Sequence, residues 1–95
     1  MKRAELVAEV ADRTGMTKKN TDEVLECILQ VIGDALAQGE SVQFQGFGTF
    51  EVRERAPRTG RHPVTGEPII IPSAHIPAFK AGKILKEKVE QHEIG

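Results

Sequence analysis

Near residue 40 the spacing of apolar residues changes from a helical period to an alternating one, and this change constrains the fold most strongly. In residues 1–39 apolar side chains recur three or four positions apart, which is the pattern of helices with a buried face. In residues 41–45, and again in 49–55, they alternate with polar side chains, as in half-buried strands. The sequence therefore predicts an α+β fold, with a helical base in 1–39 followed by a sheet.

The helical base is expected to contain two helices. The first is predicted over residues 2–14 and ends at Gly15, because glycine is the usual residue beyond a helix C-terminus. Thr17 is the expected N-cap of the second helix, which ends at Gly39. The apolar set of this second helix is broad and includes Cys27, so we expect it to be buried on more than one side.

The strand signals continue on both sides of a long segment rich in proline and glycine. Gly46-Phe47-Gly48 separates two strands and predicts a β-hairpin. Residues 56–74 hold four prolines, two glycines and little to bury. This segment is too long for an idle loop, so it is either disordered or an extended β-ribbon with its tip near residues 62–66. The ribbon is favoured because strand-like residues flank that tip.

The rest of the chain is expected to return to the body of the domain. Residues 40–55 and 75–80 would form a three-stranded antiparallel sheet, and residues 56–74 would form an arm that leaves it. A last helix is predicted over residues 81–91. The whole of 1–95 is then a single domain, which is what a chain of 95 residues allows.

Charge is unevenly distributed, although the formal net charge is only -1. Residues 1–50 hold five Lys and Arg against eight Asp and Glu, whereas residues 53–86 hold seven against two. Such asymmetry favours a surface that binds a polyanion. The alternative is a solvated loop followed by a charged helix.

Several classes of function are disfavoured. A single cysteine allows no internal disulfide, and the sequence shows neither a secretory signal nor an apolar run of membrane-spanning length. We therefore expect a soluble cytoplasmic protein without a membrane partner. His62, His75 and His92 lack metal-ligand spacing, and no nucleophile–base set is apparent. No enzyme, cofactor, metal or small-molecule substrate is expected.

Three sequence motifs carry a resemblance to a known family. Residues 46–55 read GFGTFEVRER, residues 60–67 read GRHPVTGE and residues 76–80 read IPAFK. They resemble the signature of the HU/IHF family of bacterial DNA-binding, histone-like proteins, and HU more than IHF. The resemblance covers residues 1 to about 90. It implies two helices as a base, a three-stranded sheet as a saddle, and an intertwined dimer whose two β-arms reach around DNA.

Four arginines are the main DNA-binding candidates. Arg53 and Arg55 share one face of a strand, because residues two apart in a strand point to the same side. Arg58 and Arg61 would extend this basic track toward the tip of the arm. Guanidinium groups suit phosphate oxygens and a narrow minor groove.

Pro63 is expected at the tip of the arm. The resemblance implies that its rigid apolar ring acts as a wedge that unstacks neighbouring base pairs. The other interpretation is that Pro63 only sets a turn that Gly66 closes. Both interpretations are compatible with one another.

The remaining candidates lie outside the arm. By resemblance Lys80, Lys83 and Lys86 contact phosphates on the DNA flanks and the saddle, although a solvated helix face is the alternative. Arg3 is a weaker candidate for a flank contact. The aromatic residues Phe47, Phe50 and Phe79 are expected in the dimer core.

The resemblance implies an architectural, nucleoid-associated homodimer that bends and compacts double-stranded DNA through the minor groove. Little sequence specificity is expected, because no base-reading set is visible, and bent or flexible DNA should be favoured. One alternative is an IHF-like DNA bender with a sequence preference. The other is a protein–protein scaffold module that has lost DNA binding, which only the near-neutral charge supports.

Overall fold

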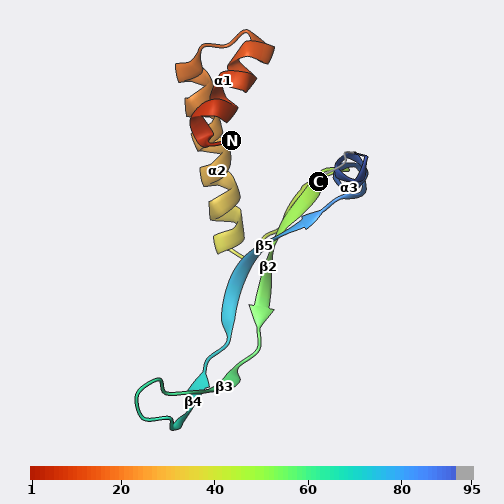
Figure 1. The fold of residues 1–95 in the computed structure, drawn as a ribbon. Coiled ribbons are helices and arrows are strands. Elements are labelled where there is room, and N and C mark those ends of the chain that lie inside the picture. The colour runs from red at the N-terminus through yellow and green to blue at the C-terminus, as the bar shows by residue number, and fades with distance from the viewer. Residues whose placement is uncertain (92–95) are drawn as a thin grey trace. The chain divides into compact units, whose positions relative to one another are not determined.

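The structure of the chain is a computed structural model that describes residues 1–91. It contains, in order, α1 (Arg3–Thr14), α2 (Lys18–Ala37), β1 (Val42–Phe44), β2 (Gly48–Arg55), β3 (Arg58–Arg61), β4 (Pro68–Ile71), β5 (Ala74–Ala81) and α3 (Lys83–Glu90) (Figure 1). The chain divides into two compact units, Met1–Ala35 and a second that begins at Leu36. None of the described helices is long and apolar enough to cross a membrane.

The two helices of the first unit begin and end at the residues that favour such boundaries. Gly15 follows α1 with φ of 75°, a left-handed conformation, and its N–H donates to the Ala11 carbonyl. The N–H of Asn20 donates to the Thr17 hydroxyl oxygen at 3.1 Å, which confirms Thr17 as the N-cap of α2. Sequence and local structure therefore agree on where α1 ends and where α2 begins.

The first unit buries very little of its apolar surface. Among the described residues it buries only Val7, Ala11 and Thr21, whereas Val31 on α2 is 61% exposed. Cys27 is also exposed, so the packed position predicted for it is wrong within the single chain. The physical reason is that α1 can cover one side of α2, while the apolar set of α2 extends over several sides.

The second unit is built on an antiparallel sheet with strand order β1-β2-β5. β5 pairs with β2 along its full length, from Gly48 opposite Ala81 to Arg55 opposite Ala74. It is therefore longer than the strand expected over 75–80. The last helix correspondingly begins at Lys83 and not at Ala81, because Ala81 is held in the sheet and Gly82 has an extended backbone.

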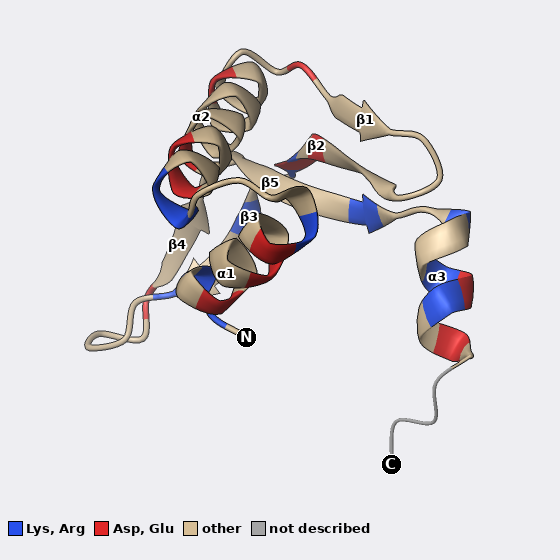
Figure 2. Ribbon diagram, turned by 90° about the horizontal axis from the view of Figure 1, so that it is seen from above, with Lys and Arg blue, Asp and Glu red and all other residues tan. Residues whose placement is uncertain are grey.

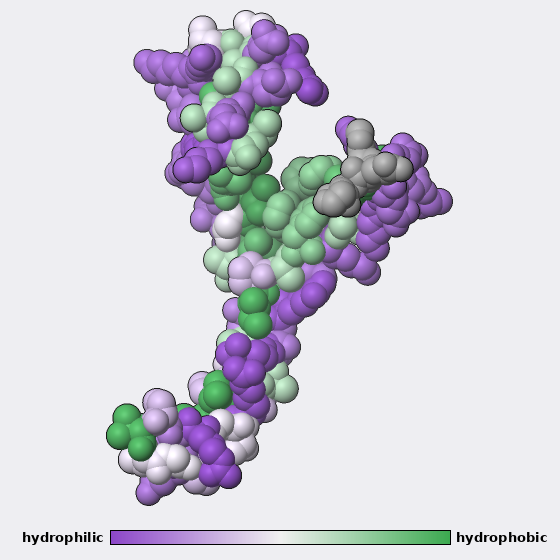
Figure 3. All heavy atoms as spheres, viewed as in Figure 1, coloured by the Kyte–Doolittle hydropathy of each residue, from purple (hydrophilic) through white to green (hydrophobic). Residues whose placement is uncertain are grey.

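One face of this sheet, here called the apolar sheet face, carries the phenylalanines. Cross-strand pairing and strand alternation place on it Val42, Phe44, Phe50, Val52, Pro77 and Phe79. The rings of Phe50 and Phe79 lie 4.8 Å apart between centroids, and the Phe47 ring from the β1–β2 turn lies 5.7 Å from that of Phe79. Phe47 is nevertheless 51% exposed. Figure 3 shows apolar residues gathered over the sheet, with hydrophilic ones predominating along the arm.

The turn between β1 and β2 docks closely on the start of α3. The N–H of Gly82 donates to the Phe47 carbonyl at 2.8 Å, and the N–H of Ile84 donates to the Gly46 carbonyl at 3.1 Å. A Cβ atom added at Gly82 would lie 2.7 Å from the Gly46 carbonyl oxygen. Only a residue without a side chain allows this approach of two backbones.

We expect Gly82→Ala to destabilise the protein by about 2 kcal/mol, because the added methyl group must push two backbone segments apart. The measurement is urea-induced unfolding followed by circular dichroism. Gly33→Ala in α2 is the matched control, since a Cβ there meets nothing within 4 Å of the chain. The control should be neutral or stabilising, by up to about 1 kcal/mol. Equal stability of Gly82→Ala and wild type would contradict the close docking.

The segment between β2 and β5 is a ribbon, which confirms that alternative over disorder. β3 and β4 pair antiparallel, from Arg58 opposite Ile71 to Arg61 opposite Pro68. We call residues 56–73 the arm and residues 62–67 its tip loop. In Figure 1 the arm continues from the ends of β2 and β5 that lie away from α3.

Candidate nucleic-acid interface

The second face of the sheet, here called the polar sheet face, is basic. Arg53 and Arg55 lie on it, as their spacing predicted. Lys80 lies on the same face. It pairs with Thr49, and Thr49 lies an even number of residues from both arginines along β2. By sequence alone Lys80 groups with the lysines of the last helix. The structure instead joins it to the two arginines on the sheet.

The guanidinium group of Arg53 has a partner within the polar sheet face. Its Nε and Nη2 donate to Glu51 Oε1 at 3.2 and 2.9 Å. Both side chains are exposed enough that such a pair contributes little to stability. A phosphate oxygen can therefore replace the carboxylate at small cost, which leaves Arg53 available to a polyanion.

The two arginines of the arm lie on opposite faces of the ribbon. Arg58 and Arg61 are three residues apart in β3, and residues an odd number apart point to opposite sides. Arg61 also donates from Nη1 to the Gly66 carbonyl at 3.0 Å. The basic track expected toward the tip is thus divided between the two faces of the arm.

The tip loop has a defined hydrogen-bonded shape. The N–H of His62 donates to the Glu67 carbonyl at 2.8 Å, and the N–H of Gly66 donates to the His62 carbonyl at 2.9 Å. Gly66 has φ of 73°, the left-handed region that glycine adopts freely. This geometry fits the turn interpretation of Pro63, and the exposed position of the loop leaves the wedge interpretation open as well.

Sequence reasoning did not single out the residue after Pro63. Val64 is 86% exposed, so the tip loop presents two adjacent apolar residues to solvent. These apolar side chains are not stabilised by burial within the single chain. The signal was available in the sequence as an apolar residue within a polar turn.

The lysines of α3 are exposed and lie among acidic side chains. Lys83 approaches Glu87 at 4.0 Å between Nζ and Oε1, and Lys86 follows one helical turn after Lys83. Figure 2 shows basic segments on β5 and α3, and acidic ones on both α1 and α2. The structure leaves open both interpretations of these lysines, phosphate contact and solvated helix face.

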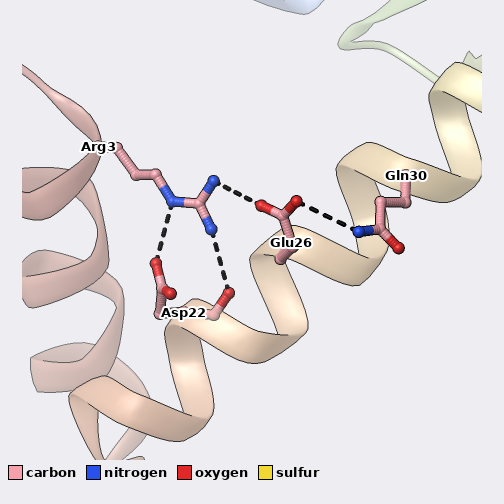
Figure 4. A network of polar contacts seen from close by, with 4 residues as sticks. All are labelled: Arg3, Asp22, Glu26 and Gln30. Atoms are coloured by element: carbon pink, nitrogen blue, oxygen red, sulfur yellow. Dashed lines mark hydrogen bonds and ion pairs between the residues drawn. The ribbon is translucent and has the colours of Figure 1, made fainter.

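Arg3 is held by two carboxylates of α2 (Figure 4). Its Nε donates to Asp22 Oδ1 at 3.0 Å and its Nη1 to Glu26 Oε2 at 2.7 Å, while Gln30 donates to the other oxygen of Glu26. The hydrogen bonds from Arg3 and then Gln30 lower the pKa of Glu26. A carboxylate with a lowered pKa stabilises the fold at neutral pH and loses that contribution as the pH falls through its folded pKa.

A flank contact by Arg3 is consequently less direct than the sequence predicted. A phosphate would have to displace the carboxylates of Asp22 and Glu26 from the guanidinium group. Arg3 stays a candidate for a flank contact, but a weaker one than a cation without a partner would be. Among the described residues, no group of three or more His, Cys, Asp or Glu side chains could hold a metal ion.

Comparisons with known proteins agree on one family. The family described as bacterial DNA-binding protein matches residues 1–90. DNA-binding protein HU-1 of Halalkalibacterium halodurans is 56% identical over 90 residues, which are 95% of this chain and all of that protein. DNA-binding protein HU of Lactococcus lactis is 54% identical over 86 residues, which are 90% of this chain and 94% of that protein.

Solved structures show the same fold. The HU–DNA cocrystal structure from Anabaena has a TM-score of 0.88 at 47% identity, and the match covers 94% of this chain and 97% of that one. HU from Thermotoga maritima has a TM-score of 0.66 at 39% identity, with 94% and 98% covered.

Proposed function

Because this chain belongs to the bacterial DNA-binding protein family, we propose that two copies of it form a homodimer that bends double-stranded DNA through the minor groove. The observation that carries the proposal is the division of the sheet into an apolar face and a basic face. The first suits a partner chain, and the second suits a phosphate backbone. Such a dimer would compact DNA in the cytoplasm, associated with the nucleoid.

The homodimer is supported by how little the single chain buries. Phe44, Phe47 and Phe79 are each at least 40% exposed although their rings form one cluster. A chain this small commonly completes its core by association. A twofold dimer lets the same apolar surface of each chain cover the other. Phe47, Phe50 and Phe79 are then core residues of the dimer, as their sequence context predicted.

DNA contact is supported by the cations of the polar sheet face and the arm. Arg53, Arg55 and Lys80 lie on one face of the sheet, and the arm adds an arginine on each of its faces. Backbone contacts of this kind hold DNA without reading its sequence. Specificity then comes from how easily the DNA deforms, so bent or flexible duplexes should bind best.

The scaffold alternative relied on the near-neutral net charge. The sheet register weakens that argument, because it places three cations on one face of the sheet whatever the total charge is. A net charge of -1 is compatible with a basic face on the sheet and acidic segments on α1 and α2. A purely protein-binding module has no evident need for three cations on one sheet face.

We expect Pro63→Ala to bend DNA much less than the wild type. Without the ring, the tip loop cannot hold an opened base step, whose unstacking costs a few kcal/mol. The measurement is fluorescence energy transfer between the two ends of a short labelled duplex at saturating protein.

Pro72→Ala is the matched control, because it removes a proline from the arm but leaves the tip loop intact. The control should bend DNA as the wild type does. A Pro63→Ala variant with undiminished energy transfer would refute the wedge.

A further inference from the structure

The tip loop is closed by the ring of His62 as well as by its backbone. His62 Nδ1 accepts a hydrogen bond from the N–H of Val64 at 3.1 Å and another from the N–H of Thr65 at 3.2 Å. The backbone N–H and carbonyl of the same residue bond to Glu67 and Gly66. One residue therefore ties together both ends and the middle of the loop that carries Pro63.

Hydrogen bonds must order this loop, because burial cannot. Every residue from His62 to Glu67 is exposed, and Val64 is 86% exposed. A loop with nothing to bury keeps its conformational freedom unless polar contacts remove it. The ring of His62 is the side chain that bonds to the two amides next after Pro63.

We propose that His62 is a positioning residue for Pro63: its Nδ1 holds the tip loop closed, so that Pro63 meets the base step in one fixed orientation. The inference rests on the proposed DNA-bending function and adds a named device to it. A wedge on a disordered loop would have to become ordered at the moment of insertion, and that cost would oppose bending. A loop already closed in the free protein avoids it.

The arrangement also requires one protonation state of the ring. Nδ1 can accept only while it carries no proton, so the neutral ring carries its proton on Nε2. A proton on Nδ1 would face the two N–H donors of Val64 and Thr65 and open the loop. The charged groups at the loop are Arg61, which precedes it and donates to the Gly66 carbonyl, and Glu67, which is its last residue.

Two substitutions separate the accepting atom from the rest of the ring. His62→Ala removes the acceptor, and two lost hydrogen bonds should lower the closed-to-open ratio of the loop about tenfold. His62→Asn restores an acceptor, because an asparagine oxygen can accept from backbone N–H groups two and three residues further along the chain.

The first measurement needs no DNA. Amide hydrogen exchange of Val64 and Thr65 should be about tenfold faster in His62→Ala than in the wild type, and close to wild type in His62→Asn. The second measurement uses a duplex with 2-aminopurine at the kinked step, whose emission rises on unstacking. This emission should be lower with His62→Ala than with the wild type, and it should return to the wild-type level with His62→Asn.

Each outcome has one meaning. If His62→Ala unstacks DNA as the wild type does while Pro63→Ala does not, the positioning role is overturned and the DNA-bending function stands. If His62→Asn fails as His62→Ala does, the accepting atom is not what matters, and the inference is again overturned. If Pro63→Ala itself unstacks DNA normally, the wedge falls, and the role of His62 falls with it.

Discussion

Replacing Phe47 with alanine should destabilise the protein by about 3–5 kcal/mol per subunit, the cost of truncating a buried phenylalanine. In the single chain this ring is 51% exposed, and its loss would be expected to cost much less. The larger value follows only if a second chain covers the apolar sheet face. Urea unfolding at several protein concentrations measures it, because the midpoint of a dimer rises with concentration.

Val64→Ala serves as the control, since Val64 is apolar and exposed but lies in the tip loop, away from the apolar sheet face. It should change the free energy of unfolding by no more than about 0.5 kcal/mol. Size-exclusion chromatography should show the wild type as a dimer and Phe47→Ala shifted toward monomer. A small effect of Phe47→Ala, together with a midpoint independent of concentration, would refute the dimer core.

Removing Arg53, Arg55 and Lys80 together should weaken DNA binding by about a thousandfold at moderate salt, because six phosphate contacts disappear from a dimer. The slope of log affinity against log salt should become shallower by about 5, at roughly 0.9 per contact. Loss of Arg53 also leaves the Glu51 carboxylate without its partner, and this carboxylate then repels the phosphates of the DNA backbone. Fluorescence anisotropy titrations at four or more salt concentrations measure both quantities.

The matched control removes three other cations with the same change in net charge: Lys2→Ala, Arg13→Ala and Lys88→Ala. All three lie outside the sheet, and Arg13 is already paired with Glu9. Net charge alone would make the two triple variants equivalent. A contact surface on the sheet predicts a much smaller change of slope for the control. Equal slopes would show that the polar sheet face does not contact the backbone.

The local elements of the fold were predictable because their determinants lie close together in the chain. Gly15 and Thr17 mark helix boundaries through their own backbone and side-chain chemistry. Their cap hydrogen bonds are made with residues no more than four positions away. Alternation predicted β1 and β2, and it predicted that Arg53 and Arg55 share a face. The proline-rich segment predicted a ribbon because strand-like residues flank it on both sides.

What involved distant residues was decided by the tertiary structure. The pairing of β2 with β5 placed Lys80 on the arginine face, and no local pattern specifies which residue of β5 lies opposite Thr49. The same pairing moved the start of α3. Arg3 looked like a free cation because the carboxylates that hold it are nineteen and twenty-three positions away.

By itself, then, the sequence determined the order of helices and strands, the end of α1, the start of α2 and the family, all of which depend on periodicity, capping and motifs. The tertiary structure alone decided which cations share a face and which residue closes the tip loop. The reason is that a cross-strand register, an ion pair between helices and a ring nitrogen facing two amides are set by distances in space. Such distances are fixed only when the whole chain satisfies its packing and its hydrogen bonds together.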